Sequence, residues 1–544
     1  MHRALSLQEI VREICAFNAG DLKSLAALAR TCRHYHELAT QELWKEIESL
    51  VPLVKCFPED SWTVADGELM FTRPLRPKDW QRVLHYSKHV FRIRLRWRKS
   101  NCQVHSSALS TLIISRPSAI LFPKAHTFIW DQDKLGIEHV GAIIGLLGPH
   151  VKHIDISDSD SLQDDCVQRL RDALCLIPRQ FPQLEHFGFG KDDDLICRGS
   201  PLFPEALLLP RTLSSLTTFR LHQIPTTEDV IYAVASLPNL QTLEITLPFH
   251  STWPAEHTPQ AFPSLRRLSL RTAAADYIAF SAIWRFPIVE NACLELIDIL
   301  DQSAVSNIFR CVREQFSATS LRKLEITCAD CPDADEALGM ESVVRPAHLQ
   351  HLFVFTALQV LELTMACQYA LNDEFYQDVA KSFPRLSTLT IAVCHWCPLD
   401  SLPSMAALVP FALHCSLRTL SVPFDGTQEL SLEDIRNALP PGRHPSRVTS
   451  LEVGYSPLTN PQLVATYLTR LFPALGGKHL IYGSMDSETD GGQERQELWS
   501  QADRFLSYFR MVREDERNIT TQQLGRTKCT NKGRRKTYAN DVNV

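Results

Sequence analysis

Two Cys-x-x-Cys pairs are the part of this 544-residue chain whose residue types and spacing come closest to a metal site. Cys328 pairs with Cys331, and Cys394 pairs with Cys397, with His395 inside the second pair. Thiolate and imidazole are the usual donors to structural zinc. The pairs lie 66 residues apart, and each directly follows the same short apolar pattern. We therefore expect packed thiols, with no metal and no cofactor.

An acidic cluster and a basic stretch could also form binding sites, but each has a simpler structural explanation. Asp155, Asp158 and Asp160 form an acidic cluster that is expected to be a solvated loop. Residues 73–99 carry ten Lys or Arg and one acid, and arginines alternate at its end from Arg92 to Arg98. Such a stretch could bind phosphate, but an edge strand protected by outward charges is favoured, because no aromatic stacking platform accompanies it. Phosphate-loop, nucleophile-elbow and zinc-protease motifs are absent from the sequence, so we expect no enzyme.

Composition is typical of a large intracellular protein. Hydrophobic residues make up 44% of the chain and the formal net charge is -6, which disfavours a nucleic-acid partner. The amphipathic segment near the N-terminus leads us to expect no signal peptide, and no window has 18 apolar residues without charge. We expect no membrane partner and a cytoplasmic or nuclear location.

One hexapeptide pattern, Leu-x-x-Leu-x-Leu/Ile, recurs along the middle of the chain and is often preceded by Phe-Pro or Leu-Pro. The alternation predicts a short strand in each copy, and segments such as 227–236 and 372–382 read as helices between strands. Starts are 24 to 37 residues apart except for one gap of 56, which the degenerate Leu294-Glu-Leu296 would fill. Weaker copies lie near Phe128 and at Val151, and the clear copies begin at Leu184, Leu216, Leu240, Leu265, Leu321, Leu358, Leu386, Leu417 and Val448.

This repeat length and the Leu-x-x-Leu-x-Leu/Ile pattern are typical of leucine-rich repeats. The predicted fold class is α/β: a curved solenoid of short parallel strands and helices whose stacked units bury a continuous core. A doubly wound α/β sheet would also alternate strands and helices, but it would not repeat one hexapeptide. Polar residues between the leucines must point outward on the strand face, which is the predicted substrate-binding surface. Its candidate residues are Glu244, Arg267, Lys323, Glu325, Glu362 and Glu452.

The first fifty residues predict three short helices. Ser6 and Glu9 have capping-box spacing, and Gly20-Asp21 ends the first helix and caps the second. The segment resembles an F-box, as found in large numbers in fungi, on the run Asp-Leu-x-x-Leu-Ala-x-Leu-Ala-x-Thr-Cys-Arg at residues 21–33 and the closing Leu43-Trp44. The resemblance implies binding to a Skp-family adaptor, and through it to a cullin. The candidate adaptor-binding residues, expected to divide between a small core and an exposed surface, are Leu5, Leu7, Ile10, Leu22, Leu25, Cys32, Leu43 and Trp44.

The C-terminal part predicts a helix that closes the open end of the solenoid, followed by a disordered basic tail. Apolar residues of this helix recur at helical spacing, at Leu498, Ala502, Phe505, Phe509 and Val512. The expected organisation is an F-box at 1–50, a connecting segment with the first solenoid strand at 51–120, repeats at 121–483, a linker and capping helix at 484–517, and the tail at 518–544.

Together, an F-box and leucine-rich repeats are similar to the substrate-recognition subunits of SCF-type cullin–RING ubiquitin ligases. Such a subunit carries out no bond chemistry and holds an unknown substrate protein close to the transferred ubiquitin. The alternative is a non-catalytic repeat scaffold whose N-terminal helices cap the solenoid and bind no adaptor.

Overall fold

The computed structural model describes most of the chain and divides it into two compact units. Unit 1 comprises residues 1–254 and 261–272, and unit 2 comprises residues 255–260 and 273–544. The described residues are 7–96, 102–131, 139–157, 164–190, 204–248, 260–298, 300–328, 342–365, 367–391, 402–414, 416–429, 431–440, 446–454, 456–475, 480–482 and 492–537.

Unit 1 opens with three helices, α1 (Gln8–Phe17), α2 (Leu22–Ala29) and α3 (Arg33–Leu43). Asp21 caps α2 as predicted, because its carboxylate accepts from the backbone N–H groups of Lys23 and Ser24 at 3.1 and 3.2 Å. Helix α1 begins at Gln8 with Leu7 at its N-cap, where no side chain accepts a capping hydrogen bond, and the predicted capping box depends on Ser6. Ser6 lies outside the described residues.

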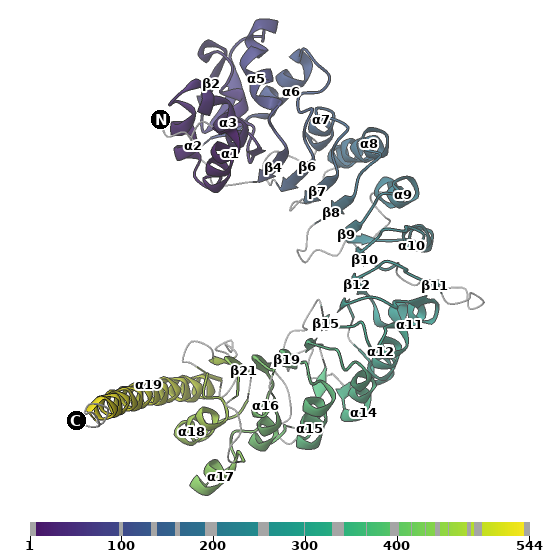
Figure 1. Cartoon of the computed structure of the whole chain (residues 1–544). Helices are drawn as coiled ribbons and strands as arrows, with labels where there is room; N and C mark the ends of the chain where they lie inside the picture. Colours follow the sequence, from purple (N-terminus) through teal and green to yellow (C-terminus); the bar gives the residue numbers. More distant parts are fainter. Residues whose placement is uncertain are drawn as a thin grey trace. The chain divides into compact units, whose positions relative to one another are not determined.

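In the described part of unit 1, eight parallel strands follow, each pairing with the next (Figure 1). Their order is β1 (Glu46–Ile47), β4 (Arg92–Arg96), β6 (Thr127–Asp131), β7 (His153–Ser157), β8 (His186–Phe189), β9 (Thr218–Pro225), β10 (Thr242–Thr246) and β12 (Arg267–Thr272). A separate small sheet contains β2 (Trp62–Ala65), β3 (Glu68–Phe71) and β5 (Gln103–Val104). The α-helices after the first three are α4 (Val51–Val54), α5 (Gln81–Ser87), α6 (Ser106–Ser115), α7 (Val140–Ile144), α8 (Asp164–Gln180), α9 (Pro204–Thr212) and α10 (Glu228–Ala235), and the 3-10 turns are η2 (Glu59–Ser61) and η3 (Pro77–Trp80).

The core of unit 1 is a ladder of apolar side chains that follows the hexapeptide register. Phe128, Ile154 and Phe187 are partners across β6, β7 and β8, and Phe219 continues the row on β9. All four are fully buried. The intervening strand residues point to the opposite side, which we call the strand face. Stacked repeats thus bury the leucine positions that no single repeat could cover.

Unit 2 repeats this arrangement, with seven parallel strands among its described residues. Their order is β14 (Asn291–Leu296), β15 (Lys323–Cys328), β17 (Val360–Thr364), β19 (Thr388–Ile391), β20 (Thr419–Ser421), β21 (Ser450–Gly454) and β22 (Leu480–Tyr482). Leu294 on β14 is the partner of Ile326 on β15, so the degenerate copy fills the long gap as predicted. The α-helices are α11 (Ala274–Ile283), α12 (Gln302–Gln315), α14 (Pro346–Leu349), α15 (Asp373–Ser382), α16 (Val409–Ala412), α17 (Leu432–Asn437), α18 (Pro461–Leu471) and α19 (Gly492–Thr537).

The remaining short elements of unit 2 are irregular parts of individual repeats. Strands β16 (Val343–Val344) and β18 (Gln368–Tyr369) pair with each other, and β13 (Trp284–Arg285) follows α11. Two 3-10 turns, η5 (Gln350–Val354) and η7 (Met405–Leu408), replace longer helices. Strand β11 (Gln260–Ala261) lies at the boundary of the two units. None of the helices in the described part of the chain is long and apolar enough to cross a bilayer.

Some expectations from the sequence differ from the structure. The arginine-rich strand β4 is not an edge strand, because β1 pairs with it through Glu46 and Ile47, inside the segment assigned to the N-terminal helices. Helix α19 does pack against α18, but its buried residues are Trp499, Ala502 and Leu506. Val512, from the predicted stripe, is 53% exposed.

Most of the segment predicted as a tail belongs to α19, which continues to Thr537. No proline interrupts this stretch, so every residue in it has a backbone N–H group that can continue the helix.

Candidate functional site

The N-terminal helices expose an apolar stripe along α1. Leu7 is 52% exposed, Ile10 is 36% exposed and Phe17 is 92% exposed. With the half-buried Ile14, these residues recur at spacings of three and four, so they share one helical face. We call this set the α1 patch. A shallow open groove on it is lined by Glu9, Ile10, Glu13, Ile14, Phe17 and Asn18.

The other candidate adaptor-binding residues differ in their burial. Leu22, at the start of α2, is 59% exposed. Leu25 is fully buried in the small helical core, and Leu43 packs against that core. Cys32 is half-buried at the N-cap position of α3. Leu5 lies outside the described residues.

Trp44 has a different environment from the α1 patch. Its indole stacks on Tyr86 of α5 with ring centroids 4.8 Å apart and an interplanar angle of 8°. This contact ties the end of α3 to the segment that precedes β4.

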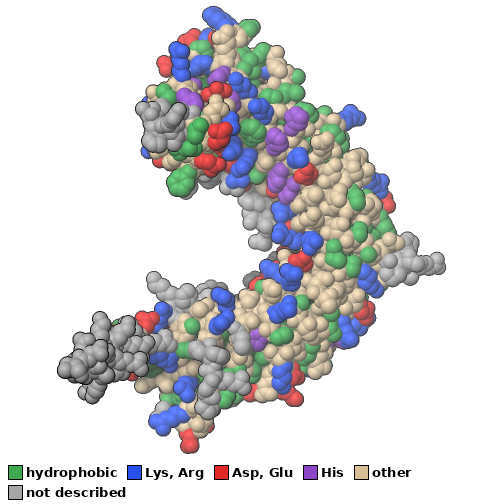
Figure 2. All heavy atoms as spheres, in the orientation of Figure 1, with side chains coloured by type: hydrophobic (Ala, Val, Ile, Leu, Met, Phe, Trp, Pro, Cys, Tyr) green, Lys and Arg blue, Asp and Glu red, His purple; other side chains and the backbone are tan. Residues whose placement is uncertain are grey.

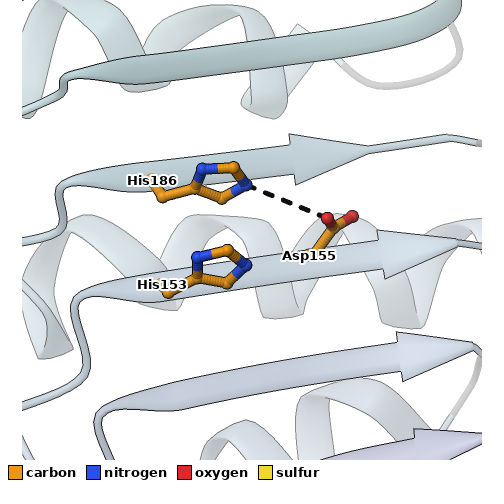
Figure 3. Close-up of side chains that lie close together, drawn as sticks. All are labelled: His153, Asp155 and His186. Atoms are coloured by element: carbon orange, nitrogen blue, oxygen red, sulfur yellow. Dashed lines mark ion pairs between the residues drawn. The ribbon is translucent and has the colours of Figure 1, made fainter. Parts of the chain in front are cut away.

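The strand face of unit 1 carries a compact cluster of two histidines and one aspartate (Figure 3). His153 on β7 and His186 on β8 are direct register partners, and their rings stack at 3.7 Å with an interplanar angle of 3°. Asp155 lies two residues along β7, on the same face, and its Oδ2 is 3.8 Å from Nε2 of His186. Figure 3 shows both rings directed toward the carboxylate.

Gly188 provides the space that this cluster needs. It is the register partner of Asp155, and a Cβ atom at Gly188 would lie 2.8 Å from Oδ1 of the aspartate. Only glycine therefore leaves the carboxylate in its observed position. Within the described residues, Nε2 of His153 and Nε2 of His186 are both buried without a hydrogen-bond partner. Buried polar atoms without hydrogen bonds cost free energy, so two of them side by side are unusual in a folded protein.

Burial and neighbouring charges determine the ionisation of the cluster. Burial, followed by the neighbouring His186, lowers the pKa of His153 to about 4, so this imidazole is neutral near pH 7. Burial acts to raise the pKa of Asp155, but the contact with His186 and the charges of His186, His153 and Arg220 outweigh it, so this pKa is lowered. The cluster thus combines a neutral imidazole with a carboxylate near pH 7.

Ion pairs flank the cluster on both sides. Arg220 on β9 contacts Glu244 on β10 at 3.0 Å, and His222 contacts the same carboxylate at 3.6 Å. On the other side, Arg92 and Arg94 of β4 contact Glu46 at 3.4 and 3.6 Å. Figure 2 shows histidine and basic side chains gathered over the strands of unit 1. The predicted residue Arg267 also lies in this unit, exposed at the start of β12.

In unit 2, the predicted strand-face residues form an acidic pair with one lysine. Glu325 on β15 and Glu362 on β17 are register partners, and Lys323 contacts Glu325 at 2.6 Å. Burial and the adjacent Glu325 raise the pKa of Glu362, whereas Lys323 partly lowers it. Glu452 occupies the same repeat position on β21, but its partner on β20 is Ser421. The structure therefore groups Lys323, Glu325 and Glu362 and leaves Glu452 apart from them.

The cysteine pairs and the acidic cluster fall mostly outside the described residues. Cys328 is half-buried at the end of β15, whereas Cys331, Cys394 and Cys397 are not described. Asp158 and Asp160 are not described either, and Asp155 lies on a strand beside two histidines instead of in a solvated loop.

Sequence reasoning missed the histidine cluster, although a signal for it was present. The copies that begin at Val151 and Leu184 both place histidine at the third position of the hexapeptide. Because consecutive parallel strands pair in register, equal repeat positions become neighbours.

Comparison with known proteins adds little to this geometry. No family model matches the sequence, and no curated protein matches it. A solved structure, the crystal structure of the Rad7 and Elc1 complex in yeast, is similar at a TM-score of 0.33 and 13% identity, covering 71% of this chain and 77% of that chain. The functional proposal for this chain therefore depends on its own residues.

Proposed function

We propose that this chain is the substrate-recognition subunit of an SCF-type cullin–RING ubiquitin ligase, acting in the cytoplasm or nucleus. Helices α1–α3 would bind a Skp-family adaptor and through it a cullin, and the strand face would bind the substrate protein. The chain would carry out no bond chemistry. It would raise the effective concentration of substrate lysines near the transferred ubiquitin.

The observation that carries this proposal is the exposed α1 patch. A small three-helix module has little core, here centred on Val11, Cys15, Leu25 and Leu38. Yet α1 leaves the Phe17 ring 92% exposed, and Leu7 is half exposed on the same face. Contiguous exposed apolar residues of this kind mark protein interaction sites.

Covering the α1 patch would contribute substantially to binding. Full burial of one large apolar side chain contributes about 1.5–3 kcal/mol. Scaled by the exposed fractions of Leu7, Ile10 and Phe17, covering the patch would contribute roughly 4 kcal/mol. That is several hundredfold to a thousandfold in Kd, because each 1.4 kcal/mol is about tenfold.

A different observation favours the scaffold alternative. Strand β1 begins at Glu46, three residues after α3 ends at Leu43, and it pairs with β4. The stacking of Trp44 on Tyr86 adds a second link at this junction. These two links support a scaffold in which the N-terminal helices cap the unit 1 strands. A cap function alone would not require the exposed residues of α1.

Adaptor capture by the full-length chain tests the proposal. We expect the double substitution Leu7→Asp with Ile10→Asp to abolish capture of a purified Skp-family adaptor, because binding would bury two unpaired carboxylates. The fold should persist, since both positions are exposed. Leu208→Asp on α9 is the matched control, because Leu208 is 51% exposed and Leu7 is 52% exposed.

Capture by the control and not by the double variant would support the adaptor role. Absence of capture by the unmodified chain, or equal capture by all three proteins, would favour the scaffold. The substrate face is tested in the same chain: Glu325→Lys with Glu362→Lys should retain the adaptor and release substrate. Loss of both partners would indicate misfolding of this variant.

A further inference from the structure

The histidine–aspartate cluster of unit 1 has the composition of a transition-metal site. We propose that His153, Asp155 and His186 bind one divalent transition-metal ion of the zinc class on the strand face. This site is separate from the proposed ligase function and does not depend on it.

The donor set selects the class of ion. Two imidazole nitrogens and one carboxylate oxygen are ligands that zinc shares with other late first-row metals. Calcium and magnesium prefer six or more oxygen ligands, so two imidazoles argue against them. Three protein ligands leave at least one coordination position for water or for a donor group of a bound molecule.

The three potential ligand atoms lie near one another. One ligand atom from each residue lies within 4.8 Å of the other two, and Nε2 of His186 is 3.8 Å from the Asp155 carboxylate. Tetrahedral zinc with ligands at about 2.0–2.1 Å holds those ligand atoms about 3.3–3.4 Å apart. Zinc binding would therefore draw the ligand atoms together by up to about 1.5 Å. It would also tilt the two stacked rings, because parallel imidazoles direct their lone pairs in parallel.

The two orphaned nitrogens point to the same conclusion independently of composition. Nε2 of His153 and Nε2 of His186 are buried, and neither has a hydrogen-bond partner among the described residues. Both rings are aimed at the carboxylate (Figure 3). A metal ion between them would satisfy both nitrogen lone pairs and one carboxylate oxygen at once.

The backbone holds this arrangement firmly. The two histidines are register partners on adjacent strands, and the space beside Asp155 exists because Gly188 has no side chain. The positive charges nearby are partly neutralised: Arg220 contacts Glu244 at 3.0 Å, and Arg94 contacts Glu46 at 3.6 Å. These pairs reduce the repulsion that an added cation would experience.

Zinc binding by the full-length chain, without an affinity tag and after treatment with a chelator, tests the proposal. We expect one equivalent of Zn²⁺ to bind by titration calorimetry, and His153→Gln or His186→Gln to weaken binding by more than about 100-fold. His222→Gln is the matched control, because His222 lies on the same strand face and contacts Glu244 instead. Zn²⁺ should raise the thermal midpoint of the unmodified chain and of this control.

A second measurement does not depend on the folding of the variants. Co²⁺ bound to the unmodified chain should give the visible spectrum of nitrogen and oxygen ligation, without a thiolate-to-metal charge-transfer band. A thiolate band would assign the metal to cysteines and overturn the proposal. It would also be overturned if the unmodified chain bound no zinc, or if both His153→Gln and His186→Gln bound it as tightly as the unmodified chain.

Discussion

The acidic pair on the strand face of unit 2 makes a specific prediction about stability. Glu325 and Glu362 are cross-strand neighbours, and Glu362 is half-buried. Two carboxylates at this spacing repel each other by roughly 3 kcal/mol at an effective dielectric constant of 20. Lys323, 2.6 Å from Glu325, offsets much of this repulsion. We expect Glu362→Gln to stabilise the chain by about 1 kcal/mol at neutral pH.

The pH dependence follows from the direction of the pKa shift. Because the pKa of Glu362 is raised in the folded chain, the folded state holds the proton more tightly than the unfolded state does. The contribution of Glu362 to stability is therefore present at low pH and is lost as pH rises through its folded pKa. The advantage of Glu362→Gln should appear only above the ordinary pKa of glutamate and then level off.

Urea unfolding followed by circular dichroism between pH 3.5 and 8 measures this difference. Glu452→Gln is the matched control, because Glu452 has the same repeat position but faces Ser421 across the strands. The reasoning would be refuted if Glu362→Gln were less stable than the unmodified chain at neutral pH. An equal advantage at pH 3.5 and pH 8 would also contradict it, since repulsion requires both carboxylates to be ionised.

Two further substitutions test the ends of the chain. Trp499→Ala should destabilise unit 2 by about 3–5 kcal/mol in urea unfolding, because the buried indole also donates a hydrogen bond to the Ser456 carbonyl at 2.8 Å. A loss below 1 kcal/mol would mean that α19 does not act as a cap. Asp21→Ala should cost about 1 kcal/mol, since two backbone N–H groups of α2 lose their acceptor. Asp21→Asn should retain most of that stability in the same assay.

Strand positions were predictable because one physical rule governs them. In Leu361-Glu362-Leu363, alternation alone decides which side chains are buried, and the structure buries both leucines and leaves Glu362 half-buried. The helices at 228–235 and 373–382 were predictable for the same reason, from apolar spacing and from the Phe-Pro or Leu-Pro pairs that follow.

The errors have a shared cause, which is that local patterns do not reveal distant partners. Strand β1 is only Glu46–Ile47, too short to show alternation, and it becomes a strand because β4 is available to pair with it. In α19, Trp499 replaces Leu498 as a core residue because the Ser456 carbonyl accepts from its indole.

The histidine cluster illustrates the limit for sites. His153 and His186 lie 33 residues apart, so no local motif connects them, and only the stacking of repeats brings them together. The aspartate was visible in the sequence as part of an acidic run, but its relevant neighbours were not. Residues at equal repeat positions are the pattern to compare in chains of this class.

The short junction between α3 and β1 has a mechanical consequence. Because β1 starts three residues after α3 and Trp44 stacks on Tyr86, no flexible tether separates the N-terminal helices from the strands of unit 1. A molecule held on α1 and another held on the unit 1 strand face would therefore keep a fixed separation and orientation relative to each other. The stiffness of this junction would position the two bound molecules. Inserting a glycine-rich loop after Leu43 would replace their single arrangement with a broad distribution of distances between them.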